Sequence, residues 1–311
     1  MSEHLVWLDD PECHLPEVAG GKGASLARMR AAGMPVPPGF VVTAAAFDHS
    51  LAGHGLQPKI AGLAAGFEPG SEGSRIARDI QGLVLGTPLA GDLIAQVSGA
   101  YAGLGSDVPV AVRSSAASED GEVASFAGQQ ETYLNVVGPD EVLERVVECW
   151  ASFFSERALF YRQSKGSLSD LGMAVVVQQQ IASDKSGVMF TTDPIRRRSD
   201  QMVIEAVFGL GEALVSGLST PDHYVAKLDG TVKKARVGRQ DQMIARDPSG
   251  GTRTLDLDAA KAAARVLGDD EIARLVALGL KLQEAFGSPQ DVEWAFEADE
   301  LFALQSRPIT A

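Results

Sequence analysis

Residues 290–308 read QDVEWAFEADELFALQSRP, and they contain two short strand patterns separated by a polar turn. In the first pattern, apolar side chains at positions 292, 294 and 296 alternate with acidic or small ones, and a strand projects alternate residues to opposite faces. We expect the chain to turn at 298–300 and to return as a second strand. That register sets Glu293 opposite Gln305 on the polar face of an antiparallel hairpin.

The polar face of this predicted hairpin carries the ligand types that magnesium and phosphate require. Glu293 offers a carboxylate and Gln305 a carboxamide oxygen, and Mg²⁺ prefers oxygen ligands. Arg307 follows shortly after and can bind the oxygens of a triphosphate. The alternative is an ordinary hairpin with a solvated acidic face, and the hairpin alone leaves both interpretations open.

The composition fits a large globular protein without nucleic-acid or membrane partners. The chain has 311 residues and 45% of them are hydrophobic, which is enough for a large core or for two lobes. A net charge of −14 and a pI of about 4.8 argue against nucleic acid and anionic membranes as partners. Local lysines and arginines can still bind a nucleotide at short range.

The same reading predicts a cytoplasmic location. The sequence shows neither a signal-peptide pattern nor an apolar run long enough to span a bilayer. Cys13 and Cys149 are the only cysteines, so we expect neither a disulfide framework nor a cysteine zinc site.

The order of helical and strand patterns predicts an α+β fold of two lobes. Strand patterns follow one another through the second half of the chain, at 173–181, 187–191, 202–208, 222–228 and 231–237. One long helix is expected over 141–163, with Asp140 as its N-cap. The contrast between a mixed first half and a strand-rich second half predicts an N-terminal lobe over 1–181 and a C-terminal lobe over 182–311.

Two basic side chains of the first half are candidates for binding phosphate. Lys22 lies in the run GGKGAS at 20–25, where glycines let backbone amides approach an anion at a helix start. Arg113 follows an apolar strand pattern and can bind phosphate through two parallel hydrogen bonds. The alternatives are a flexible turn with an exposed lysine, and an arginine paired with Glu119 or Asp120.

A loop of small residues between the first-half strands is a candidate phosphate lid. Such a loop can fold over phosphates and donate backbone N–H groups, although a run of this kind is also common in ordinary loops. The residues of the candidate lid are Ser125, Phe126, Ala127, Gly128 and Gln129.

Further candidates concern the base and the ribose of a nucleotide. Gln178, Gln180 and Ile181 end an apolar strand where the two lobes are expected to join, and backbone groups there can bind adenine. Glu212 follows a glycine-containing turn and can accept hydrogen bonds from ribose hydroxyls. The alternatives are a strand that turns polar as it leaves the core, and an ordinary turn.

Taken in order, these segments resemble one known module. The segments are GGKGASLARMRAAGMPVPPGFVVTAAAF, VAVRSSAASEDGEVASFAGQQETYLNV, SGVMFTTDP, IEAVFGLGEALVSG and QDVEWAFE with LFALQSRP. They resemble the N-terminal ATP-binding domain of the phosphoenolpyruvate synthase, pyruvate phosphate dikinase and rifampicin phosphotransferase family. The resemblance covers roughly residues 5–309, and it implies an ATP-grasp fold in which two lobes clasp ATP.

The resemblance also implies roles for matching residues. The phosphate-binding lysine and arginine of the family match Lys22 and Arg113, and its phosphate lid matches 125–129. Its metal-binding acid and amide match Glu293 and Gln305, and a further phosphate-binding arginine matches Arg307. ATP and Mg²⁺ are therefore the expected cofactors, while the adenine and ribose assignments are looser.

The implied activity is that of a dikinase-type phosphotransferase. In such enzymes the β-phosphoryl group of ATP passes to a histidine on a swivelling domain, which gives AMP and phosphate. The G-G-x-x-S-H type motif of that domain is missing here. We therefore expect two partners, a histidine-bearing domain or subunit and an acceptor-substrate domain or subunit.

The chain is then either an excised domain or, as we favour, a natural subunit of a split enzyme, as in phenylphosphate synthase and cresol-phosphorylating systems. The final acceptor stays open among pyruvate, a phenol or cresol, and an antibiotic. Two other interpretations remain, an ATP-binding regulatory subunit without turnover and a self-contained ATP-grasp ligase that forms ADP.

Overall fold

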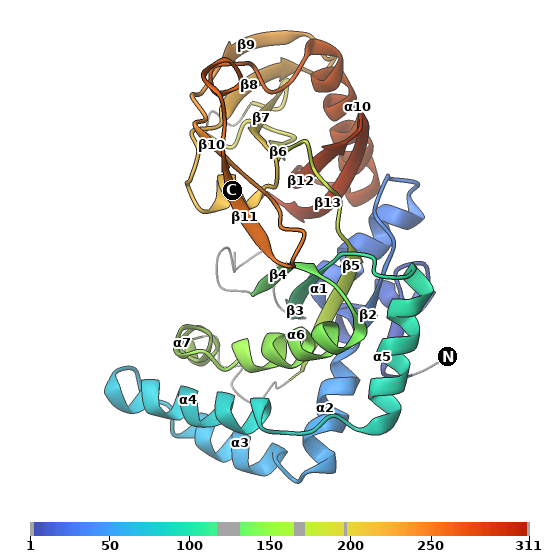
Figure 1. Ribbon diagram of the computed structural model, residues 1–311, viewed down its shortest axis with the longest axis vertical. Coiled ribbons are helices and arrows are strands. Elements are labelled where there is room, and N and C mark those ends of the chain that lie inside the picture. The colour runs from blue at the N-terminus through green and yellow to red at the C-terminus, as the bar shows by residue number, and fades with distance from the viewer. Residues whose placement is uncertain (1–2, 117–130, 165–171, 196–197, 310–311) are drawn as a thin grey trace. The chain divides into compact units, whose positions relative to one another are not determined.

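The computed structural model describes residues 3–116, 131–164, 172–195 and 198–309 (Figure 1). The chain divides into two compact units. Unit 1 comprises Met1–Ala27 and Pro38–Gln179, and unit 2 comprises Arg28–Pro37 and Gln180–Ala311. Each unit combines helices with an antiparallel sheet, so the predicted mixture of helices and strands is confirmed. Among the described helices, none combines the length and the apolar character needed to cross a membrane.

Unit 1 is built on a five-stranded sheet with the order β1-β2-β5-β3-β4, in which every neighbouring pair is antiparallel. The central strand β3 is buried throughout and β5 is buried except at Gln179, as expected of strands covered on both faces. The strands are β1 (Leu5–Trp7), β2 (Gly39–Val42), β3 (Val110–Ala116), β4 (Thr132–Val136) and β5 (Met173–Gln179).

Helices pack against one face of this sheet and form a single apolar core with it. Phe47 and Trp150 stack at its centre, with ring centroids 5.1 Å apart. The other face of the sheet receives α1, whose Gly23 approaches Val41 and Val176. The elements are η1 (Pro11–His14), α1 (Pro16–Ala31), α2 (Ala44–Gly53), α3 (Gln57–Ala65), α4 (Ser71–Leu85), α5 (Gly91–Leu104), α6 (Pro139–Ser152) and α7 (Glu156–Ser164).

Unit 2 is built on a six-stranded antiparallel sheet with the order β13-β12-β6-β7-β8-β9, and a two-stranded sheet of β10 and β11 accompanies it. The strands are β6 (Lys185–Phe190), β7 (Gln201–Phe208), β8 (Asp222–Lys227), β9 (Val232–Arg236), β10 (Gln242–Arg246), β11 (Thr252–Asp256), β12 (Gln290–Glu297) and β13 (Glu300–Pro308). The helices are α8 (Glu212–Val215), α9 (Ala259–Ala262) and α10 (Asp269–Phe286).

The long helix α10 covers one face of the larger sheet. A Cβ atom on its Gly279 would lie 2.9 Å from Met202 Sδ and 3.0 Å from Met189 Cε, so the helix backbone lies directly on the sheet. Trp294 alternates onto the same face as Met189, and its indole is fully buried. The opposite face of β12 therefore carries Glu293, and this is the face on which a ligand can bind.

Three features of the fold differ from the sequence predictions. The helix expected over 141–163 is two helices, because Ser155 begins a new one by accepting a hydrogen bond from Ala158 N at 3.3 Å. Gly138, with φ 95°, takes the N-cap position expected for Asp140, which lies in the first turn.

Residues 28–37 are the third difference, since the sequence predicts them in the N-terminal lobe and they belong to unit 2. The Ala303 N–H donates to the Pro35 carbonyl at 2.9 Å, and the Arg28 guanidinium lies 4.7 Å from the centre of the Phe286 ring. These contacts attach the segment to β13 and α10.

Candidate functional site

The glycine run of α1 forms a kink, and a serine of β3 holds that kink in place. Gly20 has φ 70° and ψ 174°, a conformation essentially restricted to glycine, and the helix continues after it. The Ser115 hydroxyl donates to the Ala19 carbonyl at 2.8 Å and accepts from the Gly23 N–H at 3.2 Å. One side chain thus joins the two sides of the kink and fixes the helix start that carries Lys22.

Lys22 contacts β3, the strand that carries Arg113. Lys22 is 6% exposed and Arg113 8% exposed. The Lys22 Nζ donates to the carbonyl oxygen of Ser114, the residue after Arg113, at 2.9 Å. The Lys22 ammonium is therefore held at the strand residue that follows Arg113, and both side chains can supply positive charge to an anionic ligand.

The strand β5 adds a candidate base-binding residue to the same face of the sheet. Arg113 pairs with Val176 and Ala111 pairs with Gln178, so Arg113 and Gln178 are diagonal neighbours on one face. Gln178 is 3% exposed. The remaining candidates of this run, Gln180 and Ile181, are also buried, but they belong to unit 2.

The predicted pairing of the two candidate metal ligands is present in the terminal hairpin. Glu293 lies opposite Gln305 in the pairing of β12 with β13. The turn is one residue shorter than predicted, since Ala298 and Asp299 form it with φ 45° and 71°. A β-bulge corrects the difference, because the register shifts between Glu293 and Trp294 and leaves Leu304 without an opposite residue.

Next to this pair, Arg307 forms an ion pair that sequence reasoning missed. Arg307 lies opposite Asp291, and its Nε and Nη2 each lie 2.8 Å from Asp291 Oδ2. Burial raises the pKa of the Asp291 carboxyl above its ordinary value, and the nearby Glu293 adds to this, while Arg307 opposes it. The D-x-E spacing is the signal that places Asp291 and Glu293 on one face.

The hairpin thus presents oxygen ligands beside a cation. Asp291, Glu293 and Gln305 supply carboxylate and carboxamide oxygens, a donor set that fits Mg²⁺. Arg307 supplies the guanidinium that fits a phosphate oxygen. Asp291 is therefore a further candidate metal or second-layer ligand in the same row of side chains.

The other candidates are less closely defined. Glu212 begins α8, is exposed, and accepts a hydrogen bond from Thr252 Oγ1 at 3.0 Å, so its carboxylate is oriented by β11. The candidate lid, Ser125 to Gln129, lies outside the residues that the structure describes.

Comparison with protein families gives one match over residues 16–311, to the family described as pyruvate phosphate dikinase, AMP/ATP-binding domain. The chain belongs to this family. Both groups of candidate side chains lie within the matched range, and the family description names the ligands AMP and ATP. The resemblance seen in the sequence motifs is therefore confirmed.

Curated relatives of this dikinase-family domain extend well beyond it. A probable phosphoenolpyruvate synthase of Archaeoglobus fulgidus is 44% identical over 98% of this chain and 41% of its own length. A rifampicin phosphotransferase of a Streptomyces species is 41% identical over 98% of this chain and 36% of its own length. The chain thus spans about two fifths of the length of these relatives.

Similarity to solved structures is weaker. The match to a biotin carboxylase complex from Campylobacter jejuni spans 93% of this chain and 40% of the biotin carboxylase chain. Its TM-score is 0.34 and the sequence identity is 11%. A likeness at this level carries no argument about the fold of the dikinase-family domain.

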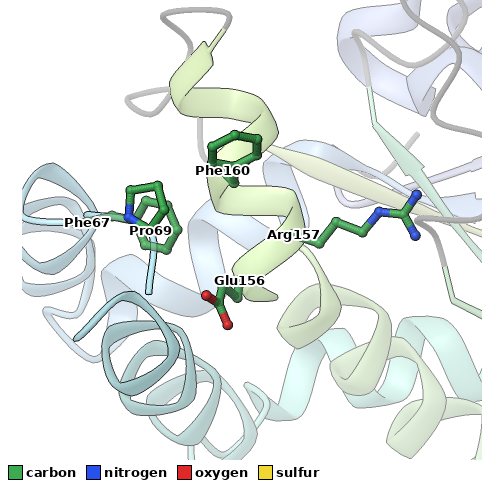
Figure 2. A pocket seen from close by; sticks show the side chains of 5 residues that line it. All are labelled: Phe67, Pro69, Glu156, Arg157 and Phe160. Carbon is green, nitrogen blue, oxygen red and sulfur yellow. The ribbon is translucent and has the colours of Figure 1, made fainter. Parts of the chain in front are cut away.

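A hollow of about 360 Å³ in unit 1 lies away from these side chains (Figure 2). It is lined by Phe67, Pro69, Glu156, Arg157 and Phe160, and none of these belongs to the candidate nucleotide-binding groups. Figure 2 shows the Arg157 side chain extending away from the two phenylalanines. The hollow is therefore a surface feature of the helical part, between the start of α7 and the segment before α4.

Proposed function

We propose that this domain has an ATP-grasp fold, binds Mg–ATP, and transfers the β-phosphoryl group to a histidine of a separate domain or subunit. The observation that carries the proposal is the row of Asp291, Glu293, Gln305 and Arg307 on one face of the hairpin. Oxygen ligands next to a guanidinium match a metal-bound triphosphate. Family membership supports ATP as the nucleotide.

In this proposal Lys22 and Arg113 of unit 1 neutralise phosphate oxygens, and Arg307 of unit 2 has the same role. Glu293 and Gln305 hold Mg²⁺, which supplies charge neutralisation at the phosphates. The resemblance assigns the phosphate lid to residues 125–129, which lie outside the described part of the chain.

The proposal also assigns residues to the adenine and the ribose of ATP. Gln178, Gln180 and Ile181 contact adenine, and Glu212 accepts hydrogen bonds from the ribose. Because Gln178, Gln180 and Ile181 are buried, we expect their backbone groups to contribute more to adenine recognition than their side chains do.

The transfer follows from positioning and electrostatics, which is what phosphoryl transfer demands of a protein. A nitrogen of the partner histidine forms a bond to the β-phosphorus while the bond to the bridging oxygen of AMP breaks. Water then cleaves the β–γ linkage and releases phosphate. The phosphohistidine passes its phosphoryl group to an acceptor bound elsewhere.

The test measures nucleotide products from Mg–ATP, with the chain alone and with a histidine-domain protein from the same genome. We expect AMP and a phosphorylated partner only in the mixture. Lys22→Ala and Arg113→Ala should lower AMP formation by at least about a hundredfold, as expected when groups that stabilise transition-state charge are lost. Lys59→Ala is the control, because Lys59 is exposed on α3.

Three outcomes contradict the proposal. ADP formed by the chain alone would indicate a self-contained ligase. Tight ATP binding without any product would indicate an ATP-binding regulatory subunit. This outcome requires a competent partner, that is, one whose histidine can be phosphorylated by other means. Substantial AMP formation by both variants would remove Lys22 and Arg113 from the mechanism.

A further inference from the structure

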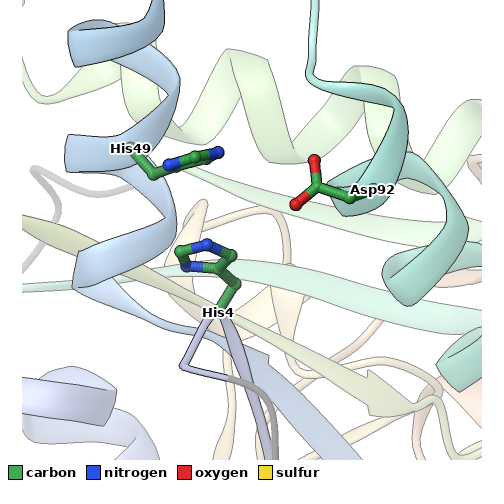
Figure 3. Close-up of side chains that lie close together, drawn as sticks. All are labelled: His4, His49 and Asp92. Carbon is green, nitrogen blue, oxygen red and sulfur yellow. The ribbon is translucent and has the colours of Figure 1, made fainter.

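Unit 1 contains a second group of metal-ligand side chains, on elements that carry none of the candidate nucleotide-binding residues. They are His4, just before β1, His49 on α2 and Asp92 on α5. One ligand atom from each lies within 4.8 Å of those of the other two. Figure 3 shows the His49 ring and the Asp92 carboxylate pointing toward each other, with the His4 ring beside them.

The fold holds His4 close to the helix that carries His49. The Thr43 N–H donates to the His4 carbonyl at 3.1 Å, and the Thr43 hydroxyl donates to the Glu3 carbonyl at 2.8 Å. The same hydroxyl caps α2 by accepting a hydrogen bond from Ala46 N at 3.3 Å. The approach of the two imidazoles is therefore built into the start of α2 and does not depend on loose side chains alone.

The distances require only a small adjustment to accommodate an ion. An ion equidistant from three atoms that are 4.8 Å apart would lie about 2.8 Å from each, against about 2.0–2.2 Å for zinc bonded to nitrogen or oxygen. Each ligand atom must then move by about 0.6–0.8 Å or less. His49 and Asp92 are exposed and His4 is half-buried, so rotation about side-chain bonds can supply this shift.

One imidazole must also turn. The His4 and His49 rings are stacked, with centroids 4.6 Å apart and planes inclined by 28°. Two near-parallel rings do not aim both lone pairs at one point. A rotation of the exposed His49 ring, which packs only partly against the protein, brings its nitrogen into line with that of His4.

We propose that His4, His49 and Asp92 bind one divalent ion of the zinc class, with water completing the coordination. Two imidazole nitrogens and one carboxylate oxygen suit Zn²⁺. Mg²⁺ prefers an all-oxygen set, so this site differs in selectivity from the proposed nucleotide site. The ion joins the N-terminal strand to two helices.

The consequence concerns β1. This strand has three residues, Leu5–Trp7, and it forms an edge of the sheet, where strands open most readily. A bound ion links His4, the residue before β1, to α2 and α5. Zinc should therefore slow the opening of β1 and raise the thermal midpoint of the chain, because an ion that binds only the folded state stabilises it.

The test is calorimetric titration of the metal-free chain with Zn²⁺ alone, together with hydrogen exchange of the β1 amides. We expect one zinc per chain and slower exchange over Leu5–Trp7 when zinc is bound. His49→Ala and Asp92→Asn should each weaken zinc binding by at least about tenfold. Both residues are exposed, so the variants should fold as the parent does.

His54→Ala is the matched control. His54 lies directly after α2, and its Nδ1 contacts the Ser50 carbonyl at 3.1 Å, so it tests whether any histidine at this end of the helix binds zinc. It should leave the affinity unchanged, and excess Mg²⁺ should not displace the zinc. The proposal is overturned if the parent chain binds no zinc, or if the Asp92→Asn or His49→Ala chain binds it as tightly as the parent.

Discussion

Replacing Gly20 by alanine should damage unit 1 more than its position in a glycine run implies. A Cβ atom there would lie 2.1 Å from the Ser115 carbonyl oxygen and 2.2 Å from its hydroxyl oxygen. Backbone strain costs about 1–3 kcal/mol, and loss of the two Ser115 hydrogen bonds, to Ala19 and Gly23, brings the total to about 2–6 kcal/mol. Lys22 would move with the displaced helix, so ATP affinity should fall as well.

The assay measures urea unfolding through the labelling of Cys149, a buried thiol of unit 1 that reacts when this unit unfolds. Gly55→Ala is the control, because Gly55 also has a positive φ, 65°, but a Cβ atom there meets no neighbour within 4 Å. The control should lose only about 1–2 kcal/mol. A loss for Gly20→Ala no larger than that of the control would refute the reasoning, since the contact with Ser115 would then have no energetic effect.

Three further predictions follow from other described contacts. Arg307→Met leaves the Asp291 carboxylate, 13% exposed, without its ion-pair partner and should lower the free energy of unfolding in urea by about 1–3 kcal/mol. A second change, Asp291→Asn, should restore most of this loss, and an unchanged urea midpoint for Arg307→Met would contradict the prediction. Burial raises the pKa of the Cys13 thiol from 9.0 to about 12 and also raises that of Cys149. Unfolded thiols ionise first, so the contribution of these two thiols to stability should be fully present below pH 9 and fall above it. Mass spectrometry should find both thiols unalkylated in the native chain at pH 9, and rapid native alkylation would contradict this. Thr43→Ala should cost about 1–2 kcal/mol of unfolding free energy while Thr43→Ser costs little, and equal losses for the two variants would argue against the cap.

In the terminal hairpin the sequence predicts the correct residue pair but not the turn length or the bulge. Alternation in β12 identified the face that carries Glu293, and the pair with Gln305 is present. The turn was predicted one residue too long, and the bulge at Leu304 compensates for it. Turn length is readable from a sequence only when its residues are distinctive, whereas a bulge depends on how the two strands twist together.

Other parts were beyond prediction because their signals are weak or long-range. The sequence does not predict the hairpin of β10 and β11, since β10 is half-buried around Ile244, β11 is partly exposed, and neither shows apolar alternation. The break between α6 and α7 follows from local capping at Ser155, which the apolar spacing alone conceals. The contact of Lys22 with β3 joins residues 92 positions apart, so only the packing of α1 on the sheet determines it.

The attachment of residues 28–37 to unit 2 has a consequence for the order of events during synthesis. The Pro35 carbonyl receives its hydrogen bond from Ala303, which lies 268 positions later in the chain. At about 5–20 residues per second, a ribosome takes about 13–54 s to make that intervening stretch. For that time the segment lacks its native neighbour, and a nascent chain can complete unit 2 only when β13 has been made.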